Sequence, residues 1–100
     1  MSDEDLRFIG ELETIVQARL KNPTEKSYTA KLAAAGIKRI AQKVGEEGVE
    51  LALAAVSGDR GEIIDEAADL VYHLIVLLAD RDIGLKDVAE RLASRHSAEA

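Results

Sequence analysis

The sequence predicts an all-α fold, and three features of its 100 residues indicate this class. Apolar residues recur at intervals of three and four along most of the chain, which is the spacing of one face of an α-helix. Hydrophobic residues make up 47% of the chain but aromatic residues only 3%, so Ala, Leu, Ile and Val must form the core, as in closely packed helices. Pro23 is the single proline, and no segment alternates with the period of a strand. We therefore expect one domain over residues 1–100, a bundle of about four to five helices.

Residues that start and stop helices divide the chain into segments. Ser2 with Asp5 three positions later resembles a capping box, and Pro23 ends the first helix. Ser27 is an expected N-cap and Gly36 an expected C-terminal cap, so a short helix lies between them. The predicted helices span residues 4–21, 28–35, 37–56, 60–81 and 86–96.

The third predicted helix contains two interior glycines next to acidic residues. Gly45 and Gly48 each cost about 1 kcal/mol relative to alanine in a helix interior. Their presence beside the acids indicates the close approach of another backbone or of a ligand, or else a local kink.

The fourth predicted helix is apolar on two sides, which bears on the oligomeric state. A helix of this kind must be covered on each apolar side. The chain has few helices to do so, and a second copy of the subunit is the simplest cover, so we predict a homodimer whose third and fourth helices pack as a bundle. The apolar residues fall into two rows, Ile63, Leu70, Leu74 and Leu77 on one side and Ile64, Val71, Ile75 and Leu78 on the other.

Charge and composition exclude several classes of function. The net charge of −6 argues against a general nucleic-acid or anionic-membrane surface, which needs a basic excess. The chain has no cysteine, so it offers neither a disulfide nor a thiolate site. The acidic N-terminus is not a signal peptide, and no apolar run approaches the roughly 18 residues that span a membrane. We expect a cytoplasmic protein with no membrane or nucleic-acid partner.

Two pairs of acidic residues flank the turn between the third and fourth helices. Glu47 and Glu50 form the first pair, with Glu46 beside them, and Glu66 and Asp69 form the second. Residues three apart lie on the same side of a helix, so each pair directs its carboxylates one way. Two antiparallel helices would bring the pairs together, with the first pair at the rim of the packed face. Because clustered carboxylates repel one another unless something neutralises them, the pattern indicates a divalent metal site.

Magnesium is the metal that this set of donors favours. Carboxylate oxygens suit hard cations, the loop signature of calcium sites is absent, and zinc usually takes more His or Cys ligands. Mg²⁺ commonly binds together with phosphate groups, for which Lys31, Lys38 and Lys43 are candidates. A solvated acidic face, with these lysines as ordinary surface charges, is the alternative. His73, one turn beyond Asp69, could be a ligand, a donor to a ligand or a dimer contact, and simple packing explains it with fewer assumptions.

The same residues carry a family resemblance that covers nearly the whole chain from Leu6 to Arg95. The two acid pairs, separated by fifteen residues, are similar to the signature of the all-α MazG-like nucleoside triphosphate pyrophosphatases. More narrowly, the chain resembles the phosphoribosyl-ATP pyrophosphatase family of histidine biosynthesis. Gly48 departs from the family pattern, where a larger residue is expected. The matching pieces are Ser27-Tyr28-Thr29, Lys31-Leu32, Gly36-Ile37-Lys38, Gln42 to Glu47, Glu50, Glu66 to Leu70, Tyr72-His73-Leu74, and Val88, Leu92 and Arg95.

The resemblance implies Mg²⁺-dependent hydrolysis of phosphoribosyl-ATP to phosphoribosyl-AMP and pyrophosphate, in a stand-alone enzyme without the cyclohydrolase domain that some family members carry. Carried over by motif position, it implies three groups of site residues. The Mg²⁺ ligands would be Glu47, Glu50, Glu66 and Asp69. Either Glu46 or one of those four would orient or deprotonate the attacking water, and the catalytic candidates are Glu46, Glu47 and Glu50. The substrate contacts would be Tyr28, Thr29, Lys31, Lys38 and Lys43.

Two other functions remain open from the sequence. One is a related pyrophosphatase that acts on ordinary or damaged nucleoside triphosphates, since the acid pattern alone identifies only the superfamily. The other is a helical dimer without catalytic activity, whose acidic residues are simply solvated. Substrate preference distinguishes the first from our prediction, and metal binding distinguishes the second.

Overall fold

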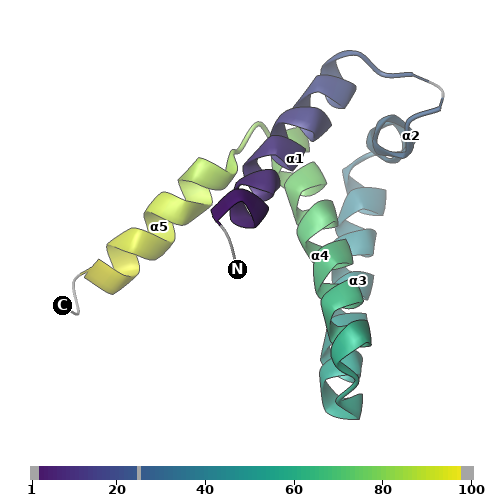
Figure 1. The fold of residues 1–100 in the computed structure, drawn as a ribbon. Coiled ribbons are helices and arrows are strands. Elements are labelled where there is room, and N and C mark those ends of the chain that lie inside the picture. Colours follow the sequence, from purple (N-terminus) through teal and green to yellow (C-terminus); the bar gives the residue numbers. More distant parts are fainter. Residues whose placement is uncertain (1–2, 25, 98–100) are drawn as a thin grey trace.

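Five α-helices make up the computed structural model, which describes residues 3–24 and 26–97 and contains no strand in those ranges (Figure 1). The predicted all-α class is confirmed, and each predicted helix is present with bounds that differ by a residue or so. Ser2, the predicted cap of the first helix, lies outside the described residues. The helices are α1 (Asp3–Lys21), α2 (Tyr28–Ala35), α3 (Ile37–Ser57), α4 (Arg60–Asp80) and α5 (Leu85–Ser97).

Ser27 and Gly36 cap the two ends of α2 as expected, and glycine and aspartate also cap the helices on either side of the hairpin turn. The Ser27 hydroxyl accepts a hydrogen bond from the backbone N–H of Ala30 at 3.1 Å, which satisfies one of the free N–H groups at the start of α2. Gly58 ends α3 in the left-handed conformation with φ of 84°, a region that favours glycine because a Cβ would crowd the backbone. Asp59 then starts α4 by accepting from the N–H of Gly61 at 2.9 Å. These caps produce the tight reversal between α3 and α4.

An antiparallel hairpin of α3 and α4 is the central feature of the fold (Figure 1). Helix α1 packs against α4 near the end that is remote from the hairpin turn, and the short α2 contacts α1, α3 and α4 at that same end. Helix α5 projects away from the hairpin on the far side of α1, and none of its residues is buried. The half of the hairpin nearest its turn therefore has only one layer.

The hydrophobic core lies where α1 and α2 meet the hairpin. It is formed by side chains from four helices, all of them at most 4% exposed: Val16, Leu32, Ile40, Ile75 and Val76. Toward the hairpin turn the apolar side chains are exposed instead, with Leu53 at 65% and Val56 at 87%. This contrast shows that the single chain covers one end of the hairpin and leaves the other uncovered.

The two interior glycines of α3 do not mark a contact within this chain. Helix α3 continues through Gly45 and Gly48, and apart from the neighbouring residues and backbone of α3 itself, a Cβ built at either position would meet no described atom within 4 Å. The close approach of another backbone expected from the sequence therefore does not occur between described segments.

No helix among the described residues is long and apolar enough to cross a bilayer.

Candidate metal centre

Three carboxylates converge between α3 and α4. Glu47 comes from α3, and Glu66 and Asp69 come from adjacent turns of α4; one oxygen of each lies within 4.8 Å of one oxygen of the other two. The antiparallel arrangement places the middle of α3 opposite the middle of α4, so the two acid-bearing segments face each other although about twenty residues separate them. The sequence prediction that two helices pool their acids is thus met by three of the four predicted ligands.

Glu47 lies deeper than its sequence position suggested. The buried residues of α3 are Ile40, Glu47 and Ala54, which are spaced seven apart and so lie on one line along the helix. That line is the seam packed against α4, and Glu47, at 5% exposed, occupies its centre rather than its rim. A carboxylate in this position requires a partner, because burying an uncompensated charge is costly.

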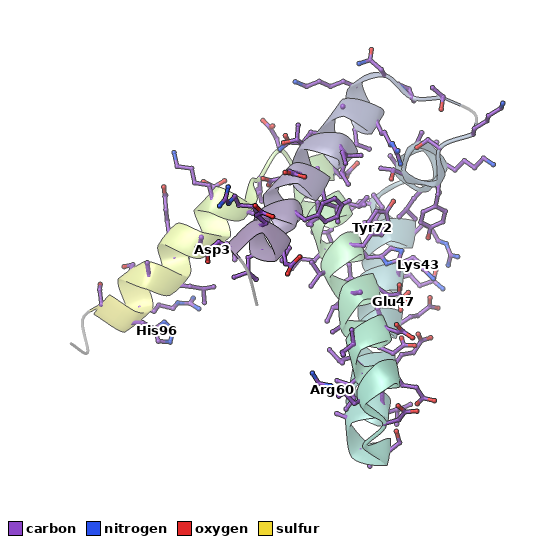
Figure 2. The ribbon with its side chains drawn as sticks, viewed as in Figure 1. Asp3, Lys43, Glu47, Arg60, Tyr72 and His96 are labelled. Carbon is purple, nitrogen blue, oxygen red and sulfur yellow. The ribbon has the colours of Figure 1, made fainter. Side chains whose placement is uncertain are left out.

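The partners of Glu47 occupy only one of its two oxygens. Lys43 Nζ lies 3.5 Å from Glu47 Oε1, and the side chain of Lys43 is itself mostly buried (Figure 2). His73 Nδ1 lies 3.8 Å from the same oxygen. By contrast, Oε2 of Glu47 and Oε2 of Glu66 are buried with no hydrogen-bond partner among the described atoms. Buried polar atoms are nearly always paired, so these two oxygens are candidates to bind a ligand such as a cation.

The donors fit a hard divalent cation. All three groups offer carboxylate oxygen, the ligand preferred by Mg²⁺ and Mn²⁺, and two of them have a buried oxygen with no partner. A cation would offset the mutual repulsion of three negative charges and would satisfy both orphaned oxygens. The residues in place therefore could hold the metal that the sequence analysis favoured.

Glu50, the fourth predicted ligand, is not part of this cluster as described. Its side chain is exposed, and it lines a cavity of about 260 Å³ together with Glu62 and Glu66. Glu50, three residues beyond Glu47, is offset from it by about 60° around α3, which is enough to move its side chain off the buried seam. Glu46 is exposed as well; its carboxylate accepts from Gln42 Nε2 at 3.0 Å and lies 3.8 Å from Lys43 Nζ. Both residues flank the cluster on the solvent side of α3.

The five predicted substrate contacts fall into different environments. Lys43 lies against the carboxylates, whereas Lys31 on α2 and Lys38 near the start of α3 are exposed. Tyr28 is 50% exposed and its hydroxyl lies 3.1 Å from His73 Nε2. Thr29 is 1% exposed, and its hydroxyl hydrogen-bonds the Tyr72 hydroxyl, so it holds α2 on α4.

Two features of this region were not predicted from the sequence: the position of Glu62 and the contact between Tyr28 and His73. Glu62, in the first turn of α4, shares the cavity with Glu50 and Glu66 but was not among the predicted site residues. The contact between Tyr28 and His73 joins residues 45 positions apart, and no local spacing could have revealed it. His73 itself was a candidate because it follows Asp69 by one turn.

Fold and site together define the class: an all-α protein with a cluster of carboxylates that could bind a hard cation between two antiparallel helices. The chain belongs to the phosphoribosyl-ATP pyrophosphohydrolase family, whose pattern it matches over residues 9–96. This confirms the family resemblance drawn from the sequence motifs.

The chain is similar to curated bifunctional proteins of histidine biosynthesis named HisIE. It is 56% identical over 92 residues to the protein of Photobacterium profundum, covering 92% of this chain and 44% of that one. It is 55% identical over 94 residues to the protein of Campylobacter jejuni, covering 94% and 45%. With the protein of Escherichia coli O157:H7 it shares 57% identity over 89 residues, covering 89% and 44%. The chain thus spans a little under half the length of these relatives.

Proposed function

We propose that this protein hydrolyses phosphoribosyl-ATP to phosphoribosyl-AMP and pyrophosphate, the pyrophosphohydrolase step of histidine biosynthesis. The observation that carries the proposal is the cluster of Glu47, Glu66 and Asp69, with two buried oxygens left unpaired, in a chain of this family. The products define the chemistry: water adds to a phosphorus atom and the anhydride bond between the α- and β-phosphates breaks. Because both the site and the substrate are negatively charged, binding requires cations that offset their repulsion.

Glu47, Glu66 and Asp69 would hold Mg²⁺, and their geometry supports this role. When bound, the ion supplies Lewis-acid polarisation of the phosphate oxygens and offsets their charge. Glu50, predicted as a fourth ligand, lies outside this cluster and lines a cavity together with Glu66. The three clustered carboxylates alone satisfy the charge of one divalent cation.

Glu50 is our candidate for orienting the attacking water. It lines the cavity next to Glu66 but is not consumed by the carboxylate cluster, so an oxygen of its side chain is available to accept a proton from water. Glu46 is the less favoured candidate, because Gln42 and Lys43 already engage its carboxylate on the outer face of α3. General bases of this kind contribute about 10²- to 10⁴-fold in rate.

Lys43 is the best placed of the basic residues to bind a phosphate. Its ammonium group already lies at the cluster, 3.5 Å from Glu47, and three rotatable N–H donors allow it to turn toward an incoming phosphate oxygen. Lys31 and Lys38 are exposed at the end of the molecule where α2 meets α3, and they could attract the substrate by longer-range electrostatics. Tyr28, at the start of α2, is 50% exposed and is a candidate contact for the nucleoside.

Pyrophosphate release from the purified protein tests the activity directly. We expect Mg²⁺-dependent release with phosphoribosyl-ATP and much slower release with a panel of dNTPs. The Glu50→Gln variant should bind Mn²⁺ with nearly the wild-type affinity and lose about 100-fold or more in kcat. Faster hydrolysis of a dNTP than of phosphoribosyl-ATP would refute the proposed substrate. Loss of metal binding in Glu50→Gln would refute the role of Glu50 as a base and make it a ligand.

We also propose that the active form is a homodimer. The exposed face of α3 toward the hairpin turn carries Val49, Leu53 and Val56, at 61%, 65% and 87% exposed, and the neighbouring α4 adds Ile64 at 54%. These positions lie on one side of α3 because they are spaced four and three apart. Large apolar side chains exposed in this number near one end of a helix pair indicate an interface, and a second hairpin would complete a four-helix bundle.

Light scattering after gel filtration tests the dimer. The subunit has a mass of 10.8 kDa, so we expect twice this value for the wild type and the subunit value for Leu53→Glu, in which a charge replaces an interface side chain. Ala55→Glu is the matched control, because Ala55 is also exposed on α3 but lies about 200° around the helix. A wild-type protein that elutes with the subunit mass at assay concentration would refute the dimer.

A further inference from the structure

His73 is a buried polar residue whose two ring nitrogens are both engaged. It lies on α4 one turn after Asp69 and is 6% exposed. Its Nδ1 is 2.8 Å from the backbone carbonyl oxygen of Asp69, and its Nε2 is 3.1 Å from the Tyr28 hydroxyl. A nitrogen that binds a metal must keep its lone pair free. These contacts therefore remove His73 from the possible metal ligands and give it another role.

The partners determine which nitrogen carries the proton. A carbonyl oxygen can only accept a hydrogen bond, so Nδ1 must carry the hydrogen that points at Asp69. In the neutral ring Nε2 is then an acceptor, and the Tyr28 hydroxyl donates to it. The Tyr28 contact consequently favours the tautomer in which the protonated edge of the ring faces the carboxylate cluster.

That protonated edge also faces Glu47. His73 Nδ1 lies 3.8 Å from Glu47 Oε1, the oxygen that Lys43 approaches from the other side at 3.5 Å. Two positively polarised groups therefore lie beside Oε1, whereas the second oxygen, Oε2, is buried with no hydrogen-bond partner among the described atoms. This asymmetry orients the carboxylate so that one oxygen is free for a cation.

Aromatic contacts prevent the imidazole from turning away. The ring of Tyr72 meets it edge-on, with centroids 5.1 Å apart and planes at 81°, and the ring of Tyr28 does so at 6.0 Å and 90°. Tyr72 is itself tied to α2 through the Thr29 hydroxyl. Helix α2 thus fixes the orientation of a side chain that contacts two of the three clustered residues.

We propose that His73 is a positioning residue for the metal centre, and that Tyr28 holds it in the required tautomer. The inference rests on the proposed function only in that the cluster of Glu47, Glu66 and Asp69 binds a divalent cation. His73 hydrogen-bonds the backbone carbonyl of Asp69 and lies 3.8 Å from the carboxylate of Glu47, and groups that orient metal ligands without touching the metal typically change affinity or activity by 10- to 100-fold when they are removed. A histidine that served packing alone would affect stability but not metal affinity.

Calorimetric titration with Mn²⁺ tests this role, with thermal unfolding measured in parallel. We expect His73→Asn to weaken Mn²⁺ binding about tenfold or more, and Tyr28→Phe, which keeps the ring but removes the hydroxyl, to weaken it by a smaller factor. The two effects should not add in the double variant, because both act through the same imidazole. Tyr28 is half exposed, so its variant remains informative even where His73→Asn does not fold.

His96→Asn is the matched control. His96 makes the same local contact, from Nδ1 to the carbonyl oxygen four residues earlier at 2.7 Å, but it is exposed on α5 away from the cluster. We expect its Mn²⁺ affinity to equal that of the wild type. An affinity for Mn²⁺ within twofold of the wild type in Tyr28→Phe and in folded His73→Asn would overturn the inference.

The outcome is separable from that of the proposed function. Weakened Mn²⁺ binding in the His73 and Tyr28 variants supports the positioning role even if the wild type does not hydrolyse phosphoribosyl-ATP. Conversely, hydrolysis by the wild type together with unchanged Mn²⁺ affinity in both variants overturns the positioning role and leaves the activity intact. A wild type that binds no Mn²⁺ overturns the inference at its starting point.

Discussion

Glu47→Gln should raise the stability of the metal-free protein while it abolishes stabilisation by metal. The substitution keeps the shape of the side chain and removes one of three clustered charges. Glu47 is 5% exposed, so its interactions are only partly screened by water. A carboxylate that is retained at a cost to the free energy of folding is expected where a ligand offsets that cost.

The magnitude follows from the distances. At the upper limit of 4.8 Å between the carboxylate oxygens and an effective dielectric constant of about 20, each repulsion of Glu47 with Glu66 or Asp69 amounts to about 3.5 kcal/mol. The attraction to Lys43 at 3.5 Å amounts to about 5 kcal/mol on the same basis. The net repulsion relieved is about 2 kcal/mol, and the exposure of Asp69 reduces it to about 1 kcal/mol through solvent screening. A gain of about 1 kcal/mol corresponds to a rise in Tm of about 4–8 °C for a domain of this size.

Thermal unfolding with and without Mg²⁺ measures both effects. In the wild type, Mg²⁺ at about 100 times its Kd should add about 2.7 kcal/mol, whereas Glu47→Gln should show no increase in Tm with Mg²⁺. Glu90→Gln is the matched control, because it removes a carboxylate that also pairs with a lysine four residues earlier, Lys86 at 3.9 Å, but is exposed on α5. The reasoning is wrong if Mg²⁺ stabilises Glu47→Gln as much as the wild type, or if the metal-free variant unfolds at a lower temperature than the wild type.

Two further perturbations test the site and the hairpin. Lys43→Met should strengthen Mn²⁺ binding to the free protein several-fold, because it removes a competing cation 3.5 Å from Glu47. The same substitution should raise the KM for phosphoribosyl-ATP. Calorimetry measures the first effect and steady-state kinetics the second, and weaker Mn²⁺ binding would contradict the first. Gly58→Ala should destabilise the protein by about 1–2 kcal/mol in urea unfolding, since φ at this position is 84°. Ala at the exposed position Gly10 of α1 is its control and should be neutral or stabilising, so equal destabilisation by both would refute the explanation.

The deep position of Glu47 depends on the packing of α3 against α4, and the orientation of His73 depends on how helix α2 meets the hairpin. The core is confined to the end where α1 and α2 cover α3 and α4, and the carboxylate cluster lies just beyond that core. The site is therefore built on well-packed helices rather than on loops, which favours a fixed geometry. The uncovered end of the hairpin, with Leu53 and Val56 exposed, is the surface at which we propose that a second copy of the subunit binds.

Local chemistry in the sequence was sufficient to predict the helices and their ends. Ser27 and Gly36 cap the two ends of α2 because capping depends on side chains and dihedral angles within a few residues of the position. The same locality made Glu66 and Asp69 predictable as neighbours, since a helical repeat determines which residues share a face. Family motifs then indicated which chemistry the acidic residues serve.

Only the tertiary structure decided which acids meet. The line of contact between α3 and α4 runs through Ile40, Glu47 and Ala54, so Glu47 is buried in the seam while Glu50 is turned toward solvent. A helical projection gives angles about one axis but not the side that a partner helix covers. The contact of Tyr28 with His73 across 45 positions is likewise determined by how α2 packs on α4. Such contacts depend on the packing of whole helices, which no short stretch of sequence specifies.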